Sequence, residues 1–386
     1  MIIGEFSESY PPHIDGVGMV VRSYCEELSK AGHTSYYIAP RNAGREYENA
    51  APETFPVIKY ASVPIPNEAY SVGLSAFDLS FQLDLNHIPF DIVHAHTPFV
   101  SALEATRIAR ERHIPLVATL HSKYYDDILM KTHSEVIAKA VVQRVVQFFN
   151  KCDEVWTVNE ATADVLRGYG FEKEIVVMPN GTNLWYPTYE DAKKAELRFD
   201  LGTGPVFLFV GQQNFKKNTD SILRAAAIYK KNRGSDFRFV FAGQGPDAEQ
   251  MHRMSEELGL SDVAVFTGHI ADREILKGLY ARASLFVFPS LYDNAPMVVR
   301  EAAAAGTPSI LIRGSCAADG VTDGENGFLC NNTPEEIAAC MERALRTAKT
   351  VGEKARQTIP IPWKGIAKQV ADRYAALIDR KKHEKR

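Results

Sequence analysis

The chain of 386 residues has few of the features that mark secreted or membrane proteins. Its five cysteines are scattered over positions 25, 152, 316, 330 and 340, and none belongs to a C-x-x-C pair. Dispersed thiols in odd number argue against a disulfide framework and a structural zinc site, and favour a cytoplasmic setting. No run approaches the ~18 apolar residues that cross a bilayer, and Met1-Ile2-Ile3 leads directly into an apparent strand. We therefore expect neither a membrane span nor a signal peptide.

The sequence also has no strongly basic stripe. Its formal net charge is −4. Residues 1–183 hold 15 Lys+Arg against 23 Asp+Glu, and residues 184–386 hold the remaining 29 against 25. This distribution disfavours nucleic acid as a partner. No G-x-G-x-x-G motif opens either half with an acidic residue ~20 positions later, which places a dinucleotide oxidoreductase last among the enzyme classes considered.

Short β-branched or aromatic runs alternate with amphipathic segments along almost the whole chain. Such a pattern is typical of parallel sheets covered by helices on both faces. It stops near Pro179-Asn180-Gly181 and restarts after Gly204. We therefore expect an α/β protein with two Rossmann-like doubly wound domains facing across a cleft: residues 1–183, and residues 184–363, with a helix in 364–386 packing back on the first. The predicted helices are 17–31, 102–113, 131–150, 219–232, 247–259, 271–282 and 334–346.

The stretch 284–310 is the most informative. An apolar run ends at Pro289-Ser290, a polar loop follows, and a helix is predicted from Pro296, at position N1, to Gly306. Free amides and the positive end of the helix dipole suit an anion at such a corner. Asp293 and Glu301 add carboxylates, which accept charge-assisted hydrogen bonds from hydroxyls. Amides for an anion beside carboxylates for hydroxyls fit a sugar nucleotide.

Further polar residues follow other predicted strands. Gly16 begins a helix where a ligand can approach the backbone closely, and His121 follows strand 116–119. Lys217 lies at a strand–helix junction, where a lysine can neutralise phosphate. His94 and His96 share a strand face and resemble a metal pair, but no acidic or cysteine ligand accompanies them at a recognisable spacing. A turn, a satisfied core histidine and a solvated lysine are the structural alternatives for these residues.

In order along the chain, several segments resemble those of the retaining glycosyltransferases of the GT-B fold, family 4. They are PPHIDGVG, DIVHAHTPF, TLHSKYYDDI, VMPNGTN, VGQQNFKKN, FAGQGP, FTGHI and FPSLYDNAPMVVREAAAAGTP. The resemblance implies a nucleotide-sugar donor held mainly by the second domain and an acceptor held by the first. It also implies that no metal or other cofactor is needed, in keeping with the lack of a convincing D-x-D motif.

The resemblance also implies roles for individual residues. Catalytic roles fall to His121, Lys217 and Asp293. Glu301 is expected to hold the ribose hydroxyls. The donor-binding set is Gly16, Gln212, Lys217, Asp293, Asn294, Ala295, Pro296, Met297, Val298 and Glu301. Two positions depart from the family pattern: Asp293 stands where Glu is usual, and Gln212 stands where Arg is usual.

We expect transfer of a hexose, with a UDP-sugar favoured as donor, to an acceptor hydroxyl with retention of configuration. The acceptor class stays open between a lipid such as diacylglycerol and a growing glycan. The segment 131–150, with Lys131, Lys139 and Arg144, is either a core helix or a peripheral membrane contact. The basic tail from Arg380 is either solvated or a contact for anionic lipid. A GT-B-fold epimerase and a weakly active or inactive nucleotide-sugar-binding protein are the remaining alternatives.

Overall fold

The structure is a computed structural model that describes residues 1–10, 15–41, 53–65 and 71–384. It divides into two compact units, one formed by Met1–Gly181 with Trp363–Arg386 and the other by Thr182–Pro362. The division falls two residues before the predicted domain boundary, and the chain returns to the first unit one residue before the predicted final helix. The predicted α/β class with two Rossmann-like parallel sheets is confirmed.

The first unit contains a seven-stranded parallel sheet in the order β3-β2-β1-β6-β7-β8-β9. Its strands are β1 (Ile2–Phe6), β2 (Thr34–Pro40), β3 (Val57–Tyr60), β6 (Ile92–Ala95), β7 (Leu116–Leu120), β8 (Glu154–Thr157) and β9 (Val176–Val177). A small antiparallel pair, β4 (Ser62–Pro64) and β5 (Ser71–Gly73), lies outside it. Every residue of β6 and β7 is buried, as expected for strands covered on both faces.

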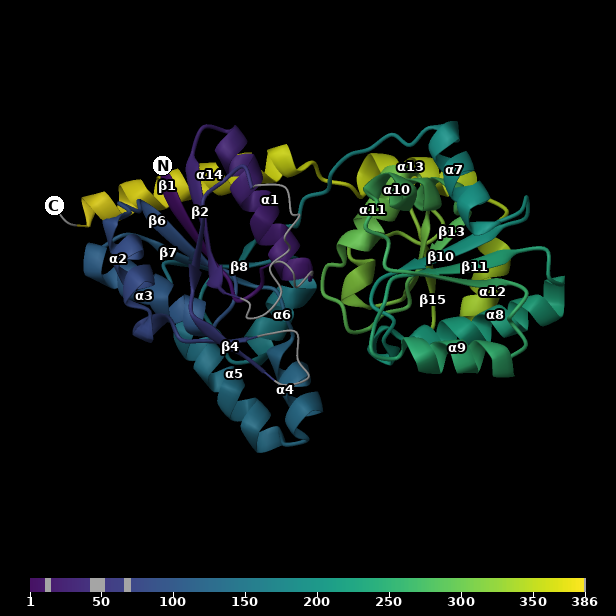
Figure 1. The fold of residues 1–386 in the computed structure, drawn as a ribbon, viewed down its shortest axis with the longest axis horizontal. Coiled ribbons are helices and arrows are strands. Elements are labelled where there is room, and N and C mark those ends of the chain that lie inside the picture. The colour runs from purple at the N-terminus through teal and green to yellow at the C-terminus, as the bar shows by residue number, and fades with distance from the viewer. Residues whose placement is uncertain (11–14, 42–52, 66–70, 385–386) are drawn as a thin grey trace. The chain divides into compact units, whose positions relative to one another are not determined.

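The helices of the first unit cover both faces of this sheet (Figure 1). They are α1 (Gly16–Lys30), α2 (Leu79–His87), α3 (Val100–Arg112), α4 (Tyr124–Thr132), α5 (Glu135–Phe149), α6 (Glu160–Gly168) and α14 (Trp363–His383), with the 3₁₀ turn η1 (Ser75–Phe77). The last helix comes from the far end of the chain and packs against α1, as the yellow ribbon of Figure 1 shows. The C-terminal helix thus belongs to the same compact unit as the N-terminal half.

The second unit contains a six-stranded parallel sheet in the order β12-β11-β10-β13-β14-β15. Its strands are β10 (Val206–Val210), β11 (Arg238–Ala242), β12 (Ala264–Gly268), β13 (Leu285–Val287), β14 (Ser309–Ile312) and β15 (Phe328–Cys330). Its helices are α7 (Tyr189–Phe199), α8 (Thr219–Arg233), α9 (Ala248–Glu257), α10 (Arg273–Arg282), α11 (Met297–Ala305), α12 (Pro334–Ala344) and α13 (Ala348–Thr358), with the short turns η2 (Phe215–Lys217) and η3 (Cys316–Ala318). Stacked phenylalanine rings contribute to its core, both along single strands and between neighbouring strands.

Each sheet has one point at which the strand order reverses. In the first unit it lies between β1 and β6, and in the second between β10 and β13. The loops that leave two such strands diverge to opposite sides of the sheet, so a crevice opens at their carboxyl ends, where ligands of this fold class bind. The loops after β1, β6, β10 and β13 are therefore the places to look for a site.

The structure differs from the prediction in three respects. The range predicted as one helix, 131–150, contains the last two residues of α4 and all of α5, which are separated because His133 adopts a left-handed conformation with φ of 52° and Ser134 caps the second helix. Pro296 is the N-cap of α11 and not position N1. Helices α2, α6, α7 and α13 were not predicted.

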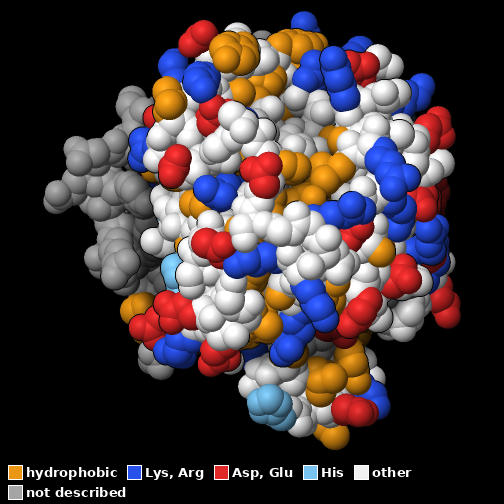
Figure 2. Space-filling model, turned by 90° about the vertical axis from the view of Figure 1, so that its right-hand side faces the viewer, with side chains coloured by type: hydrophobic (Ala, Val, Ile, Leu, Met, Phe, Trp, Pro, Cys, Tyr) orange, Lys and Arg blue, Asp and Glu red, His pale blue; other side chains and the backbone are white. Residues whose placement is uncertain are grey.

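The described surface shows no single-sign face in the view of Figure 2, where Lys and Arg side chains alternate with Asp and Glu. Among the described helices, none combines the length and the apolar character that a membrane crossing requires.

Candidate functional site

An ion pair joins the two loops at the strand-order reversal of the second unit. Lys217 follows β10 and Asp293 follows β13, and the ammonium nitrogen lies 2.6 and 2.8 Å from the two carboxylate oxygens. Both side chains are more than four-fifths buried, with exposed fractions of 16% and 19%. The two residues that the sequence singled out independently therefore meet at the crevice between β10 and β13.

Ser290 holds the Asp293 side of this ion pair through two hydrogen bonds. Its hydroxyl donates to Asp293 Oδ2 at 2.6 Å and accepts from the backbone amide of Asp293 at 3.3 Å. The ammonium group of Lys217 also lies 5.6 Å from the ring centroid of Phe288, within the range of a cation–π contact. Asp293 is thus held in one orientation, with its negative charge compensated by the lysine. Sequence reasoning did not assign a role to Ser290.

Glu301 lies in the middle of α11, the helix that follows the same loop. Tyr280 of α10 donates a hydrogen bond to Glu301 Oε2 at 3.1 Å, and Arg273 lies 3.5 Å from Oε1. Burial raises the pKa of Glu301 above its usual value, and Arg273 and the tyrosine hydroxyl oppose that shift. The Glu301 carboxylate therefore has specific partners within the second unit.

The loop and the first turn of α11 place the other predicted donor residues together. Asn294 is buried, and Ala295, Pro296, Met297 and Val298 are partly buried at the helix N-terminus. The first amides of an α-helix have no acceptor within the helix, so this end favours an anion. Gly306 ends the helix in the left-handed conformation, as its position after the alanine run predicts.

The loop after β10 packs against the loop after β11, and glycines make this possible. A Cβ atom on Gly243 would lie 2.0 Å from the carbonyl oxygen of Gly211, and one on Gly245 would lie 2.3 Å from that of Gln213. Gln213 also donates to the Gly243 carbonyl at 2.9 Å. These glycines therefore serve loop packing. Gln212 is exposed at the same edge, and within the described residues its side chain has no hydrogen-bond partner.

Gly16 and His121 belong to the first unit. Gly16 is the first residue of α1, and Asp15 caps this helix by accepting from the amide of Gly18 at 2.7 Å. Among the described residues, no atom lies within 4 Å of the position that a Cβ on Gly16 would occupy. The described surroundings therefore do not by themselves demand a glycine here. Residues 11–14 of the same motif lie outside the described residues.

His121 follows β7 and faces His96, the residue after β6. His96 Nδ1 lies 3.1 Å from His121 Nε2, and His96 Nε2 lies 2.8 Å from a carboxylate oxygen of Glu5 in β1. Burial lowers the pKa of His121 to about 3; His96 adds to this shift and Asp15 opposes it. His121 is therefore a neutral imidazole at neutral pH, able to donate or accept one hydrogen bond at each nitrogen.

Glu5, His94 and His96 are the described residues whose ligand atoms come closest to a metal-binding arrangement, within 4.8 Å of one another. Each of the histidine nitrogens already has a partner. His94 lies 2.6 Å from the Tyr374 hydroxyl and 2.7 Å from that of Thr119, and His96 bridges Glu5 and His121. These contacts describe a buried hydrogen-bond network, and sequence reasoning gave no role to Glu5.

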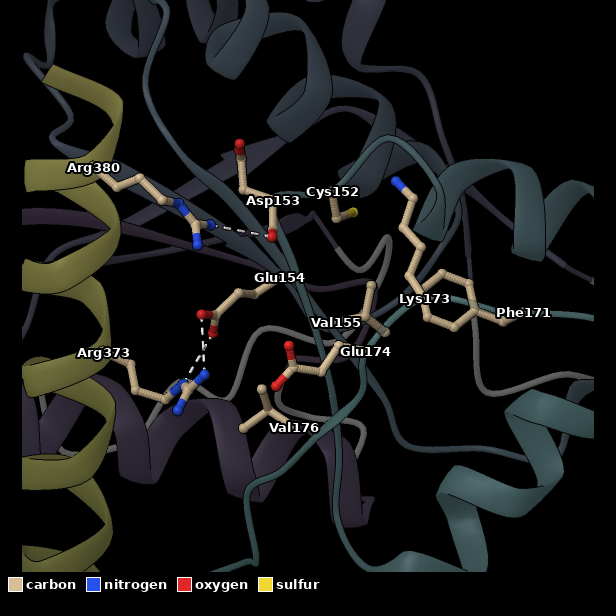
Figure 3. A pocket seen from close by; sticks show the side chains of 10 residues that line it. All are labelled: Cys152, Asp153, Glu154, Val155, Phe171, Lys173, Glu174, Val176, Arg373 and Arg380. Carbon is tan, nitrogen blue, oxygen red and sulfur yellow. Dashed lines mark hydrogen bonds and ion pairs between the residues drawn. The ribbon is translucent and has the colours of Figure 1, made fainter. Parts of the chain in front are cut away.

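A hollow of about 220 Å³ lies at the amino-terminal end of β8, at the end of the first sheet away from His121. Its lining side chains are shown in Figure 3. Arg373 of α14 makes two hydrogen bonds to Glu154, at 2.9 and 3.0 Å, and Lys381 lies 2.6 Å from Asp153. These pairs fasten α14 to the start of β8, so part of the basic tail is engaged with the first unit and is not simply solvated.

The structure thus has two Rossmann-like units, and the second gathers Lys217, Asp293 and the N-terminus of α11 where its strand order reverses. Two family models match the chain in succession. Glycosyltransferase Family 4 matches residues 14–186, and Glycosyl transferases group 1 matches residues 192–359. The chain belongs to this family of glycosyltransferases, as its motifs predicted.

Curated relatives extend over most of the chain. It is similar to the alpha-monoglucosyldiacylglycerol synthase of Streptococcus pneumoniae, with 28% identity over 318 residues that cover 80% of this chain and 70% of that protein. The enzyme of the same name from Acholeplasma laidlawii is 26% identical over 400 residues, covering 98% of both. The GDP-mannose-dependent alpha-mannosyltransferase of Corynebacterium glutamicum is 24% identical over 389 residues, covering 98% of this chain and 89% of that protein.

Solved structures share the fold at lower identity. HepE from Anabaena, in complex with UDP and glucose, superposes with a TM-score of 0.77 and 18% identity, covering 97% of this chain and 99% of that one. The sucrose-phosphate synthase of Thermosynechococcus elongatus gives a TM-score of 0.80 and 20% identity, covering 98% and 99% of the two chains.

Proposed function

We propose that this glycosyltransferase moves a hexose from a UDP-sugar to an acceptor hydroxyl, with retention of configuration and without a metal ion. One observation carries the proposal: Lys217, Asp293 and the N-terminus of α11 lie together where the strand order of the second sheet reverses. The family to which this unit belongs uses nucleotide sugars as donors. The complexes of HepE with UDP and with UDP-glucose support a uridine donor, whereas the similarity to a GDP-mannose-dependent enzyme supports guanosine as the rival base.

Each residue of the second unit then has a distinct task. The ammonium group of Lys217 and the free amides of α11 stabilise the charge that develops on the leaving diphosphate. Glu301 accepts hydrogen bonds from the ribose hydroxyls, and the carboxylate of Asp293 accepts from a sugar hydroxyl. Gln212 supplies a neutral hydrogen bond where the family pattern has a fixed cation.

For the first unit we propose that Gly16 admits the diphosphate close to the backbone and that His121 hydrogen-bonds the transferred sugar. These roles are supported by the lack of any described atom within 4 Å of a Cβ on Gly16, and by the lowered pKa of the buried His121 imidazole. The leaving phosphate is the base for the acceptor hydroxyl, so no protein nucleophile is needed.

A membrane lipid such as diacylglycerol is the acceptor we favour. The two monoglucosyldiacylglycerol synthases support a lipid. So does the hairpin of α4 and α5, which lies at the lower end of the first unit in Figure 1. Helix α5 buries Ala138, Val142, Val145 and Phe149 in the core. Near its start, however, it exposes Val136 and Ile137, at 78% and 47%, beside exposed Lys139. Such a mixture of apolar and basic side chains suits the surface of an anionic membrane.

An epimerase and an inactive binding protein are less well supported, because the relatives described above whose names state an activity are transferases or synthases. A binding role would draw only on the departures at Gln212 and Asp293.

The test is a thermal-shift screen followed by turnover. UDP-glucose is expected to raise the melting temperature more than GDP-mannose, because a ligand that binds only the native state stabilises it by mass action. Incubation with the preferred donor and vesicles containing diacylglycerol should give a glycolipid whose anomeric configuration, read by NMR, matches that of the donor. An inverted product would contradict retention, and sugar isomers formed without acceptor would favour the epimerase.

Vesicle binding tests the membrane contact separately. Replacement of Val136 and Ile137 by serine should weaken co-sedimentation with anionic vesicles. Leu197, an equally exposed apolar residue at 72% on α7, is the matched control, and its replacement by serine should have no effect. Equal losses in both variants, or no binding by the unaltered protein at low salt, would contradict the role of the hairpin.

A further inference from the structure

The His94-Ala95-His96 segment has no role in the donor site described above, yet both of its histidines are completely buried. Their rings lie on the face of the first sheet that α1 and α14 cover, with centroids 4.0 Å apart. Tyr24 of α1 contacts both rings, and Tyr374 of α14 contacts His94. A buried polar cluster is costly unless its members pair with one another, so its arrangement carries information about its role.

The cluster contains one continuous line of hydrogen bonds that reaches His121. Glu5 Oε2 lies 2.8 Å from His96 Nε2, and His96 Nδ1 lies 3.1 Å from His121 Nε2. We call Glu5, His96 and His121 the histidine chain. A neutral imidazole carries its hydrogen on one nitrogen and accepts with the other. The direction of the bond between Glu5 and His96 therefore dictates the direction of the bond between His96 and His121.

We propose that Glu5 and His96 are positioning residues that set the tautomer of His121, placing a hydrogen on His121 Nδ1 when Glu5 is protonated and on Nε2 when Glu5 is ionised. In the first state Glu5 donates to His96 Nε2, and His96 Nδ1–H donates to His121 Nε2. In the second state His121 Nε2–H donates to His96 Nδ1, and His96 Nε2–H donates to the carboxylate.

The two states differ by one proton, and the geometry accounts for its path. Starting from protonated Glu5, the carboxyl hydrogen passes to His96 Nε2, the hydrogen on His96 Nδ1 passes to His121 Nε2, and the hydrogen on His121 Nδ1 is released. Three hydrogens become two, and each of the two bonds reverses its direction. The side of His121 that faces away from His96 thus changes from a donor to an acceptor.

The surroundings of Glu5 favour the protonated state near neutral pH. Burial raises the pKa of Glu5 to about 8, and the hydrogen bond from Tyr374, at 3.2 Å, opposes that shift. The titratable groups that face Glu5 and the histidine chain are His94, Tyr24, Cys25, Tyr374 and Asp15. Burial raises the pKa values of both tyrosines and of the cysteine, and lowers that of His94, so these four groups stay neutral near pH 7 and leave Glu5 as the group that changes.

This inference draws on the proposed function only for the part that His121 plays in transfer, and the tautomer can be measured without any substrate. Nitrogen-15 NMR of the full chain with labelled histidine reports which ring nitrogen carries hydrogen. His121→Gln and His96→Gln identify the two resonance sets. We expect His121 to change from the Nδ1–H to the Nε2–H form between pH 6.5 and 9, with a midpoint near pH 8.

Two variants separate tautomer control from simple packing. Glu5→Gln keeps the shape of the side chain and removes its titration, so the His121 change should disappear. Tyr374→Phe removes one hydrogen bond to Glu5 but leaves the histidine chain intact, so the midpoint should move to higher pH. A His121 tautomer that is constant over this range, or one that changes at the same pH in all three proteins, would overturn the proposal.

Kinetic measurements then test whether the histidine chain affects sugar transfer. The turnover number should depend on pH with the same midpoint as the NMR change, and Glu5→Gln should abolish that dependence while leaving KM for the donor within about two-fold. If the NMR change occurs but the turnover number does not change over the same pH range, the role of His121 in transfer is wrong, whereas tautomer control by Glu5 stands.

Discussion

Replacement of Asp293 by asparagine should separate binding of the diphosphate from transfer of the sugar. The carboxylate of Asp293 neutralises Lys217 through contacts of 2.6 and 2.8 Å, in a setting where both side chains are largely buried. A diphosphate arriving at Lys217 therefore meets a negative charge beside the cation it needs. Asparagine keeps the shape of the side chain and the bond with Ser290, and removes that charge.

The expected size of the effect follows from the electrostatics. Two unit charges ~6 Å apart repel by about 3 kcal/mol at an effective dielectric constant of ~20. Part of that gain is offset because an uncompensated Lys217 draws in water or counterions. A net gain of about 1–2 kcal/mol remains, which corresponds to UDP binding about 5- to 30-fold tighter. The turnover number should fall, because the carboxylate no longer accepts from the sugar.

Calorimetric titration with UDP measures the first effect, and a radiolabelled transfer assay measures the second. Lys217→Ala is the comparison, since it should weaken UDP binding by about 10-fold or more through loss of a charge-assisted contact. Lys230→Ala, which breaks an ion pair with Asp262 elsewhere in the same unit, is the control and should leave UDP affinity unchanged. If Asp293→Asn weakens UDP binding as much as Lys217→Ala does, the carboxylate assists the diphosphate and the reasoning is wrong.

Three further outcomes are expected. Gly16→Ala should leave stability unchanged, because no described atom lies within 4 Å of the new methyl group, and it should lower donor affinity in calorimetry; equal affinity would exclude a close ligand. Stability in urea should peak near pH 6.5. Stability falls below that pH because the unfolded chain takes up protons at His96 and His121, whereas burial lowers the pKa of each in the folded protein to about 3. Stability falls above it because the folded protein, in which the pKa of Glu5 is raised to about 8, retains a proton that the unfolded chain has lost. A steady rise of stability to pH 8 would contradict this. Arg373→Ala should lower the free energy of unfolding by about 1–2 kcal/mol by freeing α14, whereas loss of the exposed ion pair of Lys368 should cost less than about 0.5 kcal/mol.

The fold could be predicted because its signals are local and repeated. Apolar runs such as 206–210 and 285–288 are short and rich in β-branched or aromatic residues, which favours buried strands, and the helices between them carry clear periodicity. Helix α2 was missed because its apolar residues follow no single face. The break between α4 and α5 depends on a left-handed histidine, a conformation that sequence does not favour at that residue.

The charged residues of the proposed donor site could be picked out from the sequence, but their contacts could not. Lys217, Asp293 and Glu301 stand out because each is a charged residue where a strand ends or within an apolar helix. Their pairing with one another, with Ser290 and with Tyr280 depends on which strands are neighbours, and strand order is a tertiary property. The histidine chain was missed for the same reason, since Glu5 and His96 are separated by 91 positions and meet only because β1 pairs with β6.

The most direct test of the account is calorimetric titration of UDP-glucose into the Glu301→Ala variant. We expect affinity to fall by about 10- to 100-fold, since two hydroxyls lose a charged acceptor. Glu196→Ala is the matched control, because Glu196 is a partly buried carboxylate of the same unit, paired with Arg282, and it should bind the donor like the unaltered protein. Donor affinity that is the same in Glu301→Ala and the unaltered protein would contradict the placement of the nucleotide at the β10–β13 edge.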